Sequence, residues 1–242
     1  MKKIHRILFL ALTTVLLAGC GGDSKPFKGY AVLMDSIMRV DTTANLLAFY
    51  PNYSKVDMVF GKMPRHDQEN VIFCCAAAFT GKQLKSLRHD NIAGAHAGGG
   101  DFHKGYPTSV NTGTFIYYND KFQFLPQQED KDIRRAARKG GMGFMQQMLF
   151  HSGKRMSVSL SGRERFRALA SKDGRLCIIE SRRLQDIGFF LRSLRKYGVD
   201  DAIYLVMGKG WNHSWYRDNF GDVHLLHPHQ HDFNTNWLVF YK

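Results

Sequence analysis

Short apolar runs separated by turn residues dominate this chain, and they constrain its fold more than any other feature. Runs rich in β-branched and aromatic residues are typical of strands. They occur at residues 30–40, 56–60, 71–79, 113–118, 122–125, 175–180, 201–206, 223–226 and 235–241. So many short strands can bury their apolar faces only by pairing into sheets, which predicts a sheet-rich core.

Three segments have a helical pattern between these runs. Residues 184–197 carry one apolar stripe, with cations near the C-terminal end and Gly198 as the expected C-cap. Residues 129–139 predict a second helix and residues 83–88 a third, whereas 94–101 and 208–217 read as irregular loops. We therefore expect an α+β fold: a mixed β-sheet core with a few flanking helices, in a single domain over residues 27–242.

Residues 1–19 have the order of features that a signal peptide needs. A positive n-region at residues 2–6 is followed by an apolar run at 7–17, which is too short to span a bilayer. Leu17-Ala18-Gly19-Cys20 then resembles the bacterial lipobox. That resemblance implies cleavage before Cys20 and lipid on its thiol, with residues 20–26 as a flexible tether. A plain secretory signal with an incidental cysteine is the alternative.

The chain is strongly basic, with a formal net charge of +13. Cleavage of the leader removes Lys2, Lys3 and Arg6, which leaves about +10. A basic surface attracts anionic partners over long distances. Export argues against nucleic acid as the partner, and favours anionic glycans or lipid headgroups. A generic basic exterior is the alternative, and the sequence does not indicate an oligomeric state.

The remaining cysteines, Cys74, Cys75 and Cys177, lie in apolar runs and are expected to be buried. One disulfide from Cys177 to Cys74 or Cys75 stays open for an exported protein. The sequence has no C-x-x-C pair, which argues against a zinc ribbon or a thioredoxin site. It also lacks the P-loop, dinucleotide-binding, H-E-x-x-H and G-x-S-x-G motifs.

The loop at residues 208–217 follows an apolar strand and combines glycines, cations and aromatic side chains. Glycine lets backbone N–H groups approach an anion closely, and aromatic faces can stack on a sugar ring. A surface loop held by its aromatics is the alternative. The candidate substrate-binding residues are Gly208, Gly210, Trp211, Asn212, Ser214, Tyr216 and Arg217.

Three stretches resemble motifs of the phosphodiester glycosidase family, in the same order along the chain. Cys75-Ala76-Ala77-Ala78-Phe79 stands where the family has N-G-G-F-F, and Phe166-Arg167-Ala168-Leu169-Ala170 resembles R-T-A-I-G. Leu205-Val206-Met207-Gly208-Lys209-Gly210 resembles the late L-D-G-G-G stretch. As a bacterial lipoprotein member, the chain would hydrolyse a glycosyl phosphodiester or related anionic glycan without a metal or cofactor. Its catalytic candidates are Arg167 and Lys209, to hold phosphate, and His213, to supply a proton.

Two departures from the family bear on catalysis. The early glycines are alanines here, and Val206 replaces the late aspartate. Glycosidic cleavage usually needs two carboxyl groups beside the bond. The possible replacements form no recognisable pair: Asp35, Glu180, Asp200, Asp201 and Asp218. A glycan-binding lipoprotein without catalysis therefore stays open.

Late histidines suggest a third function. His227, His229 and His231 alternate, so an extended chain would place them on one face beside His224. Imidazoles at this spacing can bind zinc or copper. Solvated histidines near Pro228 are the simpler alternative, so a metal-binding lipoprotein ranks behind the two glycan hypotheses.

Overall fold

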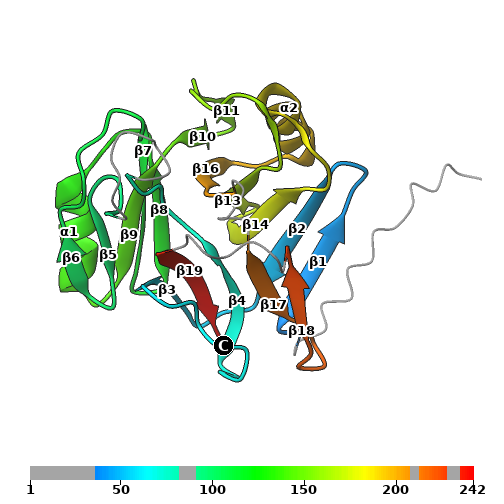
Figure 1. Ribbon diagram of the computed structural model, residues 1–242, viewed down its shortest axis with the longest axis horizontal. Helices are drawn as coiled ribbons and strands as arrows, with labels where there is room; N and C mark the ends of the chain where they lie inside the picture. Colours follow the sequence, from blue (N-terminus) through cyan, green and yellow to red (C-terminus); the bar gives the residue numbers. More distant parts are fainter. Residues whose placement is uncertain (1–35, 82–90, 208–212, 228–234) are drawn as a thin grey trace, which may run out of the picture. The chain divides into compact units, whose positions relative to one another are not determined.

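The computed structural model describes residues 36–81, 91–207, 213–227 and 235–242 (Figure 1). Residues Met34–Lys242 form one compact unit. The predicted leader, Cys20, the predicted tether and the helix predicted at 83–88 lie outside the described residues. Neither of the two helices in the described part is long and apolar enough to cross a membrane.

Three antiparallel sheets make up most of the compact unit. The seven-stranded sheet has the order β1 (Met38–Thr42), β2 (Leu46–Pro51), β14 (Arg175–Ser181), β13 (Arg167–Lys172), β16 (Asp201–Leu205), β10 (Met148–His151) and β11 (Lys154–Arg155). One five-stranded sheet has the order β18 (Val223–Leu226), β17 (Ser214–Arg217), β4 (Val71–Ala76), β19 (Asn236–Tyr241) and β3 (Lys55–Phe60). The other has the order β6 (Asp101–His103), β5 (His96–Gly98), β9 (Met142–Gln146), β7 (Gly113–Tyr118) and β8 (Lys121–Leu125).

A two-stranded ribbon, β12 (Arg163–Glu164) with β15 (Gln185–Asp186), completes the described strands. All pairs between these strands are antiparallel, so the prediction of a mixed sheet is wrong for the described part of the chain. The α+β class holds only roughly, because the described residues are mostly strand.

Two helices cover the sheets in the described part of the chain. Helix α1 (Asp130–Arg138) matches the prediction closely, whereas α2 (Ile187–Tyr197) begins later than predicted. The residues before α2 pair with β12 instead, and the Asp186 side chain caps the helix by accepting from Phe189 N at 2.8 Å. Gly198 ends α2 with a φ of +84°, as its predicted C-cap role requires.

One apolar core joins the three sheets. Phe49 of the seven-stranded sheet, Phe73 of the β4 sheet and Phe115 of the β7 sheet belong to the same buried cluster. Helix α2 packs Phe190, Leu191 and Leu194 against the seven-stranded sheet in a second cluster. Helix α1 packs against the β7 sheet, as Figure 1 shows. The shared core therefore holds the three sheets against one another.

The glycine-rich segment predicted as irregular is a hairpin between β5 and β6. Gly99 and Gly100 form its two-residue turn with φ values of +60° and +86°. Such a turn needs positive φ at both positions, which favours glycine. Gly98 has a different role, because a Cβ atom there would lie 1.9 Å from the Met58 carbonyl oxygen. The glycine run therefore closes a turn and lets β5 approach β3.

The cysteines are buried as predicted, but they are not paired. Cys74, Cys75 and Cys177 are all free thiols. The disulfide left open by the sequence is therefore absent from this structure. Cys177 belongs to β14 and the other two belong to β4, which lies in a different sheet.

Candidate active site

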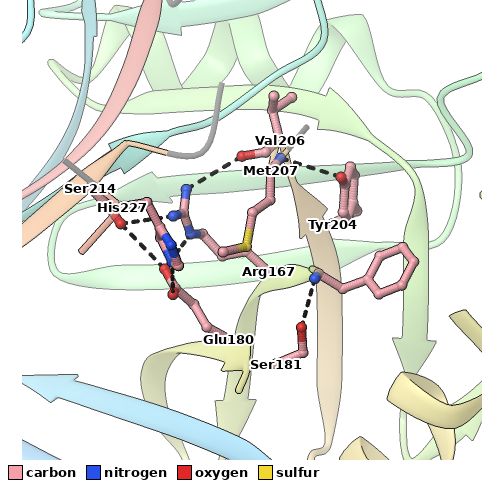
Figure 2. Close-up of polar contacts among 9 residues, drawn as sticks. Arg167, Glu180, Ser181, Tyr204, Val206, Met207, Ser214 and His227 are labelled. Atoms are coloured by element: carbon pink, nitrogen blue, oxygen red, sulfur yellow. Dashed lines mark hydrogen bonds and ion pairs between the residues drawn. The ribbon is translucent and has the colours of Figure 1, made fainter. Parts of the chain in front are cut away.

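Strand ends from two sheets meet around Arg167 (Figure 2). Arg167 begins β13, where it lies opposite Glu180 of β14 on one side and Leu205 of β16 on the other. Val206, just after β16, donates its N–H to the Ala77 carbonyl beyond β4 at 3.1 Å. The described parts of the three stretches that resemble the phosphodiester glycosidase motifs therefore lie beside one another.

The Arg167 side chain is completely buried, and within the described part of the chain it donates to the following acceptors. Its Nε lies 2.7 Å from Glu180 Oε1, its Nη2 2.8 Å from Ser214 Oγ and its Nη1 3.3 Å from the Val206 carbonyl oxygen. A buried charge is tolerated only when it is paired and hydrogen-bonded. Arg167, Glu180, Ser214 and His227 are called the Arg167 cluster below.

Glu180 is the anion at the centre of this cluster. Its Oε1 also accepts from Ser214 Oγ at 3.3 Å, and its Oε2 accepts from His227 Nε2 at 3.0 Å. Burial raises the pKa of the Glu180 carboxyl, but the Arg167 charge and the His227 hydrogen bond outweigh burial and hold the pKa at about 2. Glu180 is therefore ionised at neutral pH, although only 2% of its side chain is exposed.

His227 connects the buried cluster to the surface. Its side chain is 18% exposed, and its backbone φ of +61° is uncommon for a residue other than glycine. Its carbonyl oxygen accepts from His213 Nδ1 at 3.1 Å. Because ionised Glu180 can only accept, the neutral form of the His227 imidazole carries its proton on Nε2 and has its lone pair on Nδ1. The arrangement offers one oriented imidazole for proton transfer.

The fold is similar to that of a glycosidase domain. The zebrafish N-acetylglucosamine-1-phosphodiester alpha-N-acetylglucosaminidase catalytic domain, auto-inhibited by its pro-peptide, superimposes with a TM-score of 0.57 at 11% identity, over 86% of this chain and 82% of that one. A hypothetical protein from Synechocystis superimposes with a TM-score of 0.53 at 10% identity, over 85% of this chain and 61% of that one. No family model and no curated protein sequence matches the chain. The likeness establishes a distant relationship of fold.

The structure brings some of the predicted site residues to the cluster and places others away from it. Ser214 is a member, and His213 contacts the His227 backbone. Tyr216 instead stacks on His224 with ring centroids 4.8 Å apart. Arg217 donates to the backbone carbonyls of His66 and Gly221, both at 2.7 Å. Five predicted residues lie outside the described part: Gly208, Lys209, Gly210, Trp211 and Asn212.

Arg167 has a different setting from the one expected of a phosphate ligand. Each of its three guanidinium nitrogens donates to a described protein acceptor, and the ion pair with Glu180 holds that carboxylate in place. Direct phosphate binding by Arg167 stays a prediction that no observation here tests.

Glu180 and His227 have places in the site that the sequence did not assign to them, because Glu180 stood only among five possible carboxylates and His227 only among the candidate metal ligands. A signal for Glu180 existed, because Asp173 and Gly174 form a two-residue turn with φ values of +52° and +72°. A D-G turn of this type fixes the hairpin register and sets Arg167 opposite Glu180. For His227 the sequence suggested only a role as a metal ligand.

The described residues do not support a metal centre at the late histidines. His227 Nε2 is bonded to Glu180, while His224 Nε2 lies 2.7 Å from Asp218 Oδ2, so the two imidazoles have separate partners. No group of three metal-ligating side chains occurs within the described ranges. His229 and His231 lie outside those ranges.

Two cavities lie apart from the cluster. One of about 620 Å³ is lined by Phe60, His96 and His103 among other residues, and burial lowers the pKa of His96 there. Another of about 610 Å³ lies between the β12–β15 ribbon and the start of α2. None of their lining residues belongs to the Arg167 cluster.

The lowered pKa of Glu180 predicts a loss of stability in acid. The folded-state pKa is about 2, below the ordinary value of 4.5, so the ionised carboxylate stabilises the fold above about pH 4.5 and stops doing so as the pH falls towards 2. Urea unfolding between pH 7 and pH 2.5 should show wild type losing on the order of 2 to 3 kcal/mol more than Glu180→Gln. Parallel pH curves for the two proteins would contradict this assignment.

Proposed function

We propose that the chain is a membrane-anchored, exported hydrolase that cleaves a glycosyl phosphodiester or a related anionic glycan. The observation that carries the proposal is the meeting of the three family-like stretches at the Arg167 cluster, where a buried ion pair orients a partly exposed histidine. The distant fold likeness to a domain named for a sugar phosphodiester adds support.

The residues of the cluster suggest how the reaction would run. His227 Nδ1 takes a proton from a water molecule, whose oxygen bonds to the anomeric carbon of the sugar. The bond between that carbon and the phosphate oxygen breaks, and its electron pair leaves with the phosphate. Ionised Glu180 stabilises the imidazolium formed on His227, while Arg167 and Ser214 fix Glu180. In this proposal Lys209 neutralises the phosphate, and the glycines beside it let backbone N–H groups approach the phosphate closely.

The cellular setting is part of the proposal. The lipobox-like Leu17-Ala18-Gly19-Cys20 supports a lipid anchor on Cys20, with residues 20–26 as a tether. The domain would then face the periplasm or the cell surface, where anionic glycans are available. The partners would be that glycan and the membrane, with no nucleic acid.

Turnover of glycosyl phosphates by the purified full-length lipoprotein in detergent tests the proposal. A panel of aryl glycosyl phosphates and nucleotide sugars should release free sugar, detected by chromatography, and the heat-unfolded protein should release none. Absence of sugar release across the panel at micromolar enzyme would count against hydrolysis.

Val206 favours one alternative, a glycan-binding protein without catalysis. It replaces the family aspartate, and it is fully buried with its carbonyl accepting from Arg167. Calorimetric binding of a panel compound without any sugar release would support this alternative over the hydrolase.

A further inference from the structure

The β12–β15 ribbon and the start of α2 form a surface with exposed apolar side chains. Leu184, just before β15, is 55% exposed, and Phe189 in the first turn of α2 is 37% exposed. Arg163 Nε donates to the Leu184 carbonyl at 3.4 Å, which ties the ribbon to this turn. Leu184 and Phe189 line one groove, so their exposed apolar surface lies together and is not scattered over the protein.

Positive charge surrounds these two side chains. Arg163 and Arg183 line a groove of about 610 Å³ together with Leu184 and Phe189, and these four residues are called the basic groove. The Arg192 guanidinium lies 5.6 Å from the centre of the Phe189 ring. Within the described part of the chain these three arginines form no ion pair.

Asp186 is the one acid among the described residues that line the groove. Asp186 lies opposite Arg163 in the ribbon, but its carboxylate accepts the Phe189 N–H as the cap of α2. Arg163, Arg183 and Arg192 outnumber this carboxylate, so the groove keeps a net positive charge beside aliphatic and aromatic surface. Guanidinium groups bind phosphate through paired N–H donors, and the apolar side chains need a non-aqueous environment.

We propose that the basic groove docks on the surface of an anionic phospholipid bilayer. Arg163, Arg183 and Arg192 would contact lipid phosphates, while Leu184 and Phe189 would enter the boundary between headgroups and acyl chains. A polyanionic glycan would satisfy the arginines but would leave the exposed leucine without a partner. The inference rests on the described groove and does not require the hydrolase activity.

Vesicle co-sedimentation tests docking without the lipid anchor. Residues 21–242 include the compact unit Met34–Lys242 entire and lack the proposed lipidated cysteine. They should bind vesicles of phosphatidylglycerol and phosphatidylcholine and not vesicles of phosphatidylcholine alone. Arg183→Gln should weaken binding about fivefold, and Leu184→Ser about threefold to fivefold.

Two matched variants control for charge and for apolar exposure. Lys62→Gln removes an exposed cation elsewhere, and Phe220→Ser removes a 93% exposed aromatic from the turn between β17 and β18. Both should bind like wild type. Equal binding to neutral vesicles, or groove variants that behave like their controls, would overturn the proposal. A loss with Arg183→Gln but none with Leu184→Ser would indicate binding of anions alone and would also overturn it.

Discussion

Replacing Arg167 with methionine is expected to lower the free energy of unfolding by about 3 to 5 kcal/mol, because it leaves the Glu180 carboxylate buried without its cation. Glu180 is 2% exposed, and it would keep only the hydrogen bonds from Ser214 and His227. Methionine is close to arginine in length and fills most of the same space. Urea unfolding at pH 7 measures the loss.

A double-mutant cycle separates the ion pair from simple packing damage. Glu180→Leu alone should also destabilise the fold, because it leaves the Arg167 cation buried. The double variant Arg167→Met/Glu180→Leu should recover much of the loss, since no unpaired charge remains. The exposed Arg155→Met should change stability by no more than about 0.5 kcal/mol. If Arg167→Met were as mild as Arg155→Met, the buried ion pair would not be what stabilises this part of the fold.

Many strands could be predicted from the sequence because their own residues carry the signal. The run at 113–118 matches β7, and the run at 223–226 matches β18. Strand β9 was missed because Gly143 stands in its middle and reads as a breaker. The structure explains that glycine, because a Cβ atom there would lie 2.9 Å from the Phe115 carbonyl oxygen. The sequence does not predict β17, because its polar and aromatic residues have the composition of a loop. The segment is a strand because it pairs with β4.

The site could be predicted only in part, for a similar reason. Arg167 was identified from a local motif, and the turn at Asp173-Gly174 would have placed Glu180 opposite it. His227 reaches Glu180 across 47 positions in the chain and from a segment beyond β18, and no local pattern records such a contact. The burial of Arg167 and its ion pair with Glu180 depend on contacts between strands, so the local motif does not contain them.

His227→Asn is expected to lower kcat/KM for a glycosyl phosphate by about a hundredfold to ten-thousandfold if the proposed hydrolase is correct. Asparagine tolerates the positive φ of this position. Its shorter side chain does not reach Glu180 as His227 Nε2 does, but Arg167 and Ser214 still hold the carboxylate, so the fold should survive. It cannot take up a proton at the position of Nδ1. The rate of sugar release by the purified variants measures the effect.

His224→Asn provides the matched control three positions earlier in the chain. His224 pairs with Asp218 and stacks on Tyr216, and its side chain is 45% exposed, so its loss removes an imidazole from outside the Arg167 cluster. The two variants have the same change of side chain, and only the one at His227 interrupts the path from Glu180 to the surface. Equal activity of both variants would exclude His227 as the proton carrier. Glu180 would then only stabilise the fold, because the other described residues that contact its carboxylate, Arg167 and Ser214, are fully buried.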